Sequence, residues 1–264
     1  MVKKELNLAN KIWEIIYPVA MYYATIVIAM FCAQFIFGAG NETYMLCKII
    51  GSVVTLVVVW SFYKRDLALE GKLGRKFHFT KDAIINALWI LGITVCISIS
   101  LNNIITMSPL ISISESYDDA ANAFYGSNIW VELLGSALIT PILEEMLHRG
   151  VVYNRLRHMT GMWMSILISS LIFAGLHFNL VQFVYAFLLG IVFALIMEKT
   201  GWLFAPILAH VVANAIAVVR TETGILASTM DGSLFAWGIS VGLLLAGIVG
   251  LVIYCRKIFG KVNV

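Results

Sequence analysis

Two adjacent glutamates, Glu144 and Glu145, lie inside an apolar segment, and Arg149 follows one helical turn later. Ionisable side chains at membrane depth cost free energy, so they are rare and usually mark a functional site. On a helix, Glu145 and Arg149 have the better order for an ion pair, with the acid N-terminal. Glu144 points about 100° away from Glu145 and keeps no local partner, which makes it the stronger candidate for chemistry. A buried ion-pair network that only joins helices is the alternative.

Three further polar side chains occur in apolar segments: His177, one turn after Phe173, and the pair His210 and Asn214. His210 and Asn214 are four residues apart on one helix face, so both can donate hydrogen bonds toward a common point. Each group also has a structural explanation. A histidine near a helix end can be hydrogen bonded without any catalytic role, and a His–Asn pair can clamp two helices together.

Prolines precede two of these groups. Pro141 lies three residues before Glu144, and Pro206 lies four residues before His210. A proline inside a helix removes one backbone hydrogen bond and kinks the helix. Carbonyl groups freed in this way are tolerated at membrane depth where they are buried in protein or line a wet cavity. The prolines therefore favour a polar cavity, although simple helix bending explains either one.

These residue types suit the hydrolysis of an amide by water. A carboxylate and an imidazole side by side, here Glu144 and His177, can hold a water molecule and take its proton. A histidine and an asparagine on a facing helix, here His210 and Asn214, can donate hydrogen bonds to the oxyanion that forms. No serine or cysteine lies in a nucleophile motif, so the attack needs no covalent intermediate.

A zinc site is the alternative use of the same residues. Glu144, His177 and His210 could supply three ligands and leave the fourth position open for water. The chain contains no HExxH motif, so the common signature of zinc proteases is missing. Its four cysteines fall singly and give no metal-type spacing.

The elements that carry these residues are transmembrane helices. Hydrophobic residues make up 61% of the 264 residues and charged residues only 12%, with a mean hydropathy of +0.91. Such values exclude an ordinary soluble domain and predict an all-α, polytopic bundle, with residues 1–264 as a single membrane domain. Segments long enough to cross a bilayer number about eight. They are expected at about 18–38, 45–63, 83–101, 129–150, 162–178, 181–198, 202–219 and 234–255.

Lysine and arginine placement predicts the orientation. With the N-terminus in the cytoplasm and eight alternating helices, every lysine and arginine except Lys48 and Arg220 falls on the inner side. The outer loop 102–128 contains acidic residues and no lysine or arginine. We therefore expect N-in and C-in topology, and the basic inner loops favour cytoplasmic access to the site. The net charge of +3 reflects this topology, so no nucleic-acid partner is expected.

Helix geometry predicts that the polar groups converge. If a hairpin turns at Thr160-Gly161, Glu144 and His177 each lie 16 to 17 residues from the turn, roughly 25 Å along their helices, and so are level. His210 lies about ten residues beyond a second break near Thr200-Gly201, which brings it within reach.

The three motifs occur in a characteristic order: Glu144-Glu145-x-x-x-Arg149, then Phe173-x-x-x-His177, then His210-x-x-x-Asn214. This pattern resembles the signature of the CPBP (CAAX protease and bacteriocin-processing, or Abi) intramembrane glutamic endopeptidases. That family includes the type II CAAX prenyl endopeptidase of eukaryotes. The resemblance covers residues 129–219, the expected catalytic core, whereas the three N-terminal helices match only in being apolar.

The resemblance implies a role for each motif residue. Glu144 would be the catalytic base, with His177 positioning and activating the water. His210 and Asn214 would form the oxyanion hole, and Glu145 and Arg149 would support the site. The family is described as metal-independent, so no cofactor is expected, with zinc on Glu144, His177 and His210 as the alternative.

The resemblance also implies a setting. The expected substrate is a membrane-associated peptide or protein, cleaved near the surface of the lipid bilayer by a multi-pass protein. The short loops and compact size favour a bacterial plasma membrane. Bacterial members are implicated in peptide maturation, bacteriocin processing and immunity, and phage defence, whereas prenylated substrates belong to eukaryotic members. A non-enzymatic immunity or scaffold protein is a second hypothesis. A small transporter with Glu144 as a proton relay is a third, although the inverted repeats common in transporters are missing.

Overall fold

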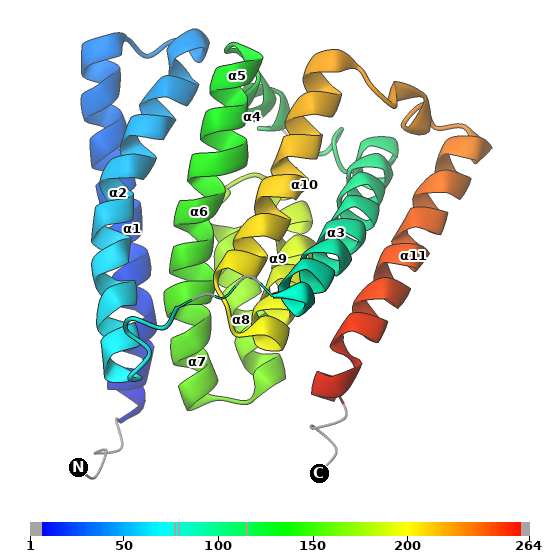
Figure 1. Ribbon diagram of the computed structural model, residues 1–264. Coiled ribbons are helices and arrows are strands. Elements are labelled where there is room, and N and C mark those ends of the chain that lie inside the picture. The colour runs from blue at the N-terminus through cyan, green and yellow to red at the C-terminus, as the bar shows by residue number, and fades with distance from the viewer. Residues whose placement is uncertain (1–6, 77, 79, 115, 260–264) are drawn as a thin grey trace.

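The computed structural model describes residues 7–76, 78, 80–114 and 116–259, without the side chains of Lys257 and Phe259. Within these residues the regular structure is helical and contains no strand. Helices α1 (Leu8–Phe37) and α2 (Asn41–Leu69) pack together on one flank of a bundle (Figure 1). Helices α3 (Lys81–Met107) and α11 (Leu234–Phe259) pack together on the opposite flank. The predicted all-α polytopic bundle is confirmed.

A continuous helix, residues 129–159, runs through the middle of the bundle. It comprises α5 (Ile129–Glu132), a π-helical stretch (Leu133–Ile139), α6 (Thr140–Glu145), a second π-helical stretch (Met146–Tyr153) and α7 (Asn154–Met159). Each π-helical stretch carries i→i+5 hydrogen bonds, which widen the helix and often accompany functional sites. The glutamate pair thus lies on six residues of ordinary α-helix between two distorted stretches. We call the whole element the central helix.

The remaining helices surround the central helix. They are α4 (Tyr117–Phe124), α8 (Met162–Gly175), α9 (Leu180–Thr200) and α10 (Phe204–Thr223), with a 3₁₀ turn at Ala227–Thr229. Helix α8 packs against α9 as a hairpin, and α10 packs against α3, α9 and the central helix. Two apolar cores fill the spaces, one centred on α3, α9 and α10, the other on α1, α2 and the central helix.

The breaks between helices follow local sequence. The central helix ends at Met159 and α8 begins at Met162, so the hairpin turn predicted at 160–161 is confirmed. Gly201 ends α9 in the left-handed region, with φ of 64°, which costs glycine little. Asn179 starts α9 by accepting a hydrogen bond from the backbone N–H of Gln182 at 3.1 Å.

The expected count of about eight crossings is not confirmed. Among the described residues, six helices are long and apolar enough to cross a membrane: α1, α2, α3, α9, α10 and α11. The central helix is long and apolar enough only when it is counted together with α4, from which it is bent by 105°. Helix α8 has 14 residues and rises about 21 Å, which is short of a bilayer core about 30 Å thick. Its C-terminal turn therefore ends inside the depth of the bundle.

Figure 1 places the start of α1 and the end of α11 at the same end of the bundle, which an even number of crossings requires. Which side of the membrane this end faces stays a prediction. We call it the terminal end. The opposite end carries the connections α1–α2, α3–α4 and α10–α11.

Buried ion pairs fasten the helices at the terminal end. Arg155 on α7 donates to both oxygens of Asp66 on α2, at 2.6 and 3.0 Å, and to the backbone carbonyl of Glu14 on α1, at 2.7 Å. Arg157 pairs with Glu198 on α9 at 2.9 Å. The arginines that sequence analysis assigned to an inner loop thus join four helices.

Replacing Asp66 by alanine should destabilise the bundle strongly, because the substitution leaves Arg155 buried without its bidentate partner. We expect a loss of about 3–5 kcal/mol, measured as thermal unfolding in detergent. Arg65→Gln is the matched control, because the Arg65 side chain is 51% exposed and its pairs should contribute at most about 1 kcal/mol. Equal losses for the two variants would contradict the account.

Candidate active site

A cavity of about 420 Å³ lies between the central helix and helices α1, α2, α3, α9 and α10. Glu144, His177, His210 and Asn214 all line it, so the structure brings together the four residues predicted to converge. They come from the central helix, the α8–α9 turn and α10. Most of the other lining residues are aromatic or aliphatic, which keeps the cavity largely apolar around a few polar groups.

Glu144 faces this cavity, and an oxygen of its carboxylate lies 3.8 Å from Nε2 of His210. Among the described residues that line the cavity, it is the only carboxylate. The backbone carbonyl of Glu144 accepts a hydrogen bond from Nδ1 of His148 at 2.7 Å. The carboxylate itself therefore remains available to a molecule inside the cavity.

Glu145 points into protein instead. Its Oε1 accepts hydrogen bonds from Nη1 of Arg149, at 2.8 Å, and from Nδ1 of His210, at 2.9 Å. The predicted ion pair between Glu145 and Arg149 is confirmed, and both side chains are fully buried. The two neighbouring acids thus have different surroundings. Glu145 lies beside the guanidinium of Arg149, whereas Glu144 faces the cavity.

Arg149 is held from several sides. Its Nη2 donates to the backbone carbonyl of Gly190 at 2.9 Å, and its guanidinium lies 4.7 Å from the ring centre of Phe173. A Cβ atom at Gly190 would lie 3.2 Å from Nη2 of Arg149 and 3.1 Å from Cβ of Ser170. The close approach of α9 that gives Nη2 of Arg149 its acceptor is therefore one that glycine makes easy.

Three histidines at the site are fixed in the same way, through Nδ1. Nδ1 of His148 meets the carbonyl of Glu144, Nδ1 of His177 meets the carbonyl of Phe173 at 3.0 Å, and Nδ1 of His210 meets the Glu145 carboxylate. Carbonyl and carboxylate oxygens only accept, so Nδ1 must carry the proton in each ring. In a neutral ring, Nε2 is then left as an acceptor of protons and hydrogen bonds.

Asn214 is positioned by a carbonyl that Pro141 leaves free. The backbone N–H of Thr140 donates to the carbonyl of Gly135, five residues back. Continued by one residue, this pattern would pair residue 141 with the carbonyl of Ser136, but proline has no N–H to donate. Nδ2 of Asn214 donates to that carbonyl instead, at 2.8 Å, and Ser136 lines the cavity. The expectation of a freed carbonyl at a cavity is therefore confirmed for Pro141.

For Pro206 the expectation of a kink is wrong. Helix α10 begins at Phe204, so Pro206 lies in its first turn. The N–H groups of a first turn have no partner within the helix, so proline removes no hydrogen bond there.

His148, Tyr22 and Lys48 are among the cavity residues that the sequence did not predict. The signal for His148 was its spacing, because it follows Glu144 by four residues and shares its helix face. Its Nε2 is buried and has no hydrogen-bond partner. Tyr22 and Lys48 come from α1 and α2, whose sequences show only that they are apolar helices.

The structure contains no preformed zinc site among its described residues. In the part of the chain that the structure describes, no group of three or more His, Cys, Asp or Glu side chains is placed to hold a metal ion. Glu144, His177 and His210 line one cavity without forming such a group. We therefore derive no step through a metal.

The direction in which the cavity opens conflicts with the expected access. The residues that α2 and α3 contribute lie near the start of α2 and the end of α3, and those of α10 lie between His210 and Val218. All these parts point away from the terminal end (Figure 1). With the predicted N-in and C-in orientation, the cavity would open away from the cytoplasm. Both the orientation and the side of access stay predictions, and this position of the cavity does not favour the two together.

Residues 126–216 match the family model described as "Type II CAAX prenyl endopeptidase Rce1-like". The chain is also similar to "Putative membrane peptidase YdiL" of Bacillus subtilis, 31% identical over 87 residues, which is 33% of this chain and 36% of that protein. An "Uncharacterized 24.3 kDa protein" of Escherichia coli is 31% identical over 97 residues, or 35% of this chain and 45% of that protein. The matches thus span less than half of these two relatives. No solved structure matches the chain significantly.

The matched segment contains all three motifs and every residue predicted for the site. The resemblance read from the motifs is therefore confirmed: residues 126–216 of this multi-pass membrane protein are similar to the Rce1-like type II CAAX prenyl endopeptidases.

Proposed function

We propose that the protein is an intramembrane endopeptidase, in which Glu144 and His177 activate a water molecule that attacks a peptide bond. The observation that carries this proposal is the placement of Glu144. It is the one carboxylate among the described cavity residues, it faces histidines, and it lies in the segment that matches a peptidase family. The match of a relative described as a membrane peptidase supports the same class of reaction.

The water is held by two acceptors. One O–H of the water donates a hydrogen bond to the carboxylate of Glu144, and the other donates to Nε2 of His177. Nε2 can accept because the proton of a neutral His177 ring lies on Nδ1, which donates to the carbonyl of Phe173. As the water oxygen attacks the carbonyl carbon, its proton passes to Glu144. When the tetrahedral intermediate collapses, the C–N bond breaks and Glu144 returns the proton to the leaving amine.

The oxyanion is stabilised by His210 and Asn214. Asn214 uses one amide N–H on Ser136 and keeps the second for the oxyanion. For Nε2 of His210 to donate as well, the ring must carry both protons. The ring of His210 is held between two carboxylates, with Glu145 at Nδ1 and Glu144 3.8 Å from Nε2. In the proposed scheme, Nε2–H of His210 donates a hydrogen bond to the oxyanion.

Glu145 and Arg149 act as positioning residues in this scheme. Glu145 fixes the orientation of His210, as a carboxylate behind a catalytic histidine does in other hydrolases. Arg149 offsets the charge of Glu145, so the acid next to Glu144 already has its own partner. The pair therefore makes two adjacent acids compatible with burial.

The proposed substrate is a membrane-associated peptide or protein, because the cavity lies within the span of apolar helices and is lined mainly by apolar and aromatic side chains. With the orientation predicted from basic residues, the cavity opens on the extracytoplasmic side. We propose that substrates enter from that side of a bacterial plasma membrane, the two named relatives being bacterial.

Replacing Glu144 by glutamine should abolish peptide release, because the amide is nearly isosteric and cannot take the proton from water. General bases contribute about 10²- to 10⁴-fold, so we expect a loss of at least about 100-fold. The measurement compares peptides released by cells that carry wild-type or Glu144→Gln protein at matched membrane abundance. Glu42→Gln, the same substitution at an exposed glutamate on α2, is the control.

A chelator arm separates the zinc alternative. Peptides that disappear with Glu144→Gln and persist under chelation support the metal-independent reaction. Release that stops under chelation and returns with added zinc would favour a zinc protease. Identical peptide sets from wild type and Glu144→Gln would count against proteolysis and favour an immunity or scaffold protein.

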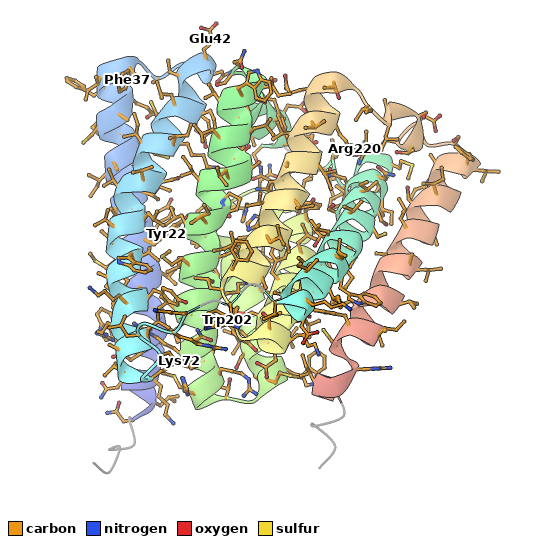
Figure 2. The ribbon with its side chains drawn as sticks, viewed as in Figure 1. Tyr22, Phe37, Glu42, Lys72, Trp202 and Arg220 are labelled. Carbon is orange, nitrogen blue, oxygen red and sulfur yellow. The ribbon has the colours of Figure 1, made fainter. Side chains whose placement is uncertain are left out.

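Cysteine labelling tests the side of access. In a background without the four native cysteines, we expect Glu42→Cys to react with a membrane-impermeant maleimide in intact cells. Lys72→Cys should react only after the membrane is opened. Figure 2 shows these two residues at opposite ends of the bundle, and both are exposed. The reverse pattern would overturn the N-in orientation and put the mouth of the cavity in the cytoplasm.

A further inference from the structure

Lys48 on α2 lines the same cavity as Glu144. Among the described residues that form its wall, Lys48 is the only lysine or arginine, as Glu144 is the only carboxylate. The cavity wall thus carries one lysine and one acid, and its other described side chains are uncharged apart from the histidines. Neither the three motifs nor the matched segment 126–216 includes Lys48.

This ammonium group feels the charge of Glu144 across the cavity but does not contact a carboxylate of any described residue. It forms no salt bridge with any described residue, and it lies 3.9 Å from the ring centre of Phe124. By contrast, three arginines inside the bundle are paired or hydrogen bonded: Arg149 with Glu145, Arg155 with Asp66, and Arg220 with Asn103 at 2.7 Å. A cation–π contact supplies only part of what a charge loses on leaving water. Lys48 therefore has capacity left for an anion that enters the cavity.

The position of Lys48 relative to Glu144 follows from the packing of α2 on the central helix. A Cβ atom at Gly135 would collide with the side chain of Met45 and touch that of Ile49, so Lys48 lies level with Gly135. Both helices run from the end opposite the termini toward the terminal end (Figure 1). Glu144 follows Gly135 by nine residues, which places its Cα roughly 13 Å deeper in the bundle.

That separation suits an extended peptide. A strand advances about 3.3 Å per residue, so roughly four residues connect the level of Glu144 with that of Lys48. Toward the mouth, the wall beside Lys48 includes Tyr44, Tyr117 and Tyr125, whose hydroxyl groups can donate hydrogen bonds. The upper cavity is therefore suited to bind an anion, whereas a carboxylate deeper in the cavity would be repelled by Glu144.

We propose that Lys48 binds a carboxylate group of the peptide substrate, located within about four residues of the bond that is cleaved. This inference rests on the proposed peptidase function and adds a specificity residue to it. With the carboxylate on Lys48, an uncharged peptide bond lies at Glu144 and the substrate has one register. The carboxylate is either the C-terminal group of the peptide or the side chain of an aspartate or glutamate, and both share this chemistry.

The experiment uses the peptides that depend on Glu144. Peptides released by wild-type cells, after subtraction of those still released with Glu144→Gln, should carry a carboxylate at a fixed distance from the new terminus. Lys48→Gln and Lys48→Glu are compared at matched abundance, with Lys48→Arg as the variant that keeps the charge. Synthetic copies of a released sequence are then cleaved as pairs, with a C-terminal carboxylate or carboxamide, and with Glu or Gln at the internal acidic position.

We expect wild type and Lys48→Arg to prefer one carboxylate-bearing member of a pair by about tenfold or more, the size of a charged hydrogen bond. Lys48→Gln should remove this preference, and Lys48→Glu should reverse it toward the carboxamide or glutamine member of the pair. The C-terminal pair and the internal pair identify which carboxylate is bound. A merely structural lysine would change abundance or total rate without changing these ratios.

Unchanged preference in both Lys48→Gln and Lys48→Glu, or no carboxylate preference in wild type, would overturn the role of Lys48 while leaving the peptidase intact. Failure of the proposed function itself gives a different result, because no Glu144-dependent peptide would then exist. If Lys48→Gln does not accumulate, the ratio in Lys48→Glu relative to Lys48→Arg decides the question.

Discussion

The placement of charge between Glu144 and Glu145 is the constraint on which the rest of the site depends. Two adjacent carboxylates inside a membrane bundle oppose each other's ionisation unless one is compensated. Here Arg149 and His210 both contact Glu145, and the fully buried arginine also donates from Nη2 to the carbonyl of Gly190. Gly190 belongs to α9 and His210 to α10. The contacts that compensate Glu145 therefore also hold α9 and α10 against the central helix. Glu144 is thereby left facing a space that three helices define.

The motif residues could be placed from the sequence because their geometry is local and periodic. The order of Glu145 and Arg149 on one helix face predicts their ion pair, and equal spacing of Glu144 and His177 from the turn at 160–161 predicts that they are level. Pro141 carried more information than expected. Its missing N–H frees the carbonyl of Ser136, and Asn214 takes that carbonyl. A backbone defect on one helix thus positions a side chain on another, which connects the proline to the proposed oxyanion site.

Other features depend on contacts between distant segments and could not be predicted. Helix α8 ends at Gly175, so a segment expected to cross the membrane stops at the depth of the site and supplies His177 from its turn. Pro206 lies in a first turn because α10 begins at Phe204, two residues later than the predicted segment. Lys48 and Tyr22 reach the cavity from helices with no motif. The mouth of the cavity follows from which helix ends surround it, and no periodicity within one helix contains that information.

The two glutamates have separate tasks in the proposed mechanism. Glu144 performs the chemistry, and Glu145 positions His210 while it pairs with Arg149. Peptide release and thermal unfolding, measured on Glu144→Gln and Glu145→Gln in one membrane preparation, test this most directly. The account predicts that Glu144→Gln loses release and keeps wild-type stability. Glu145→Gln should lose about 3–5 kcal/mol of stability, because Arg149 is then buried without a counter-charge. An active Glu144→Gln with lowered stability, together with a Glu145→Gln of wild-type stability, would contradict the assignment.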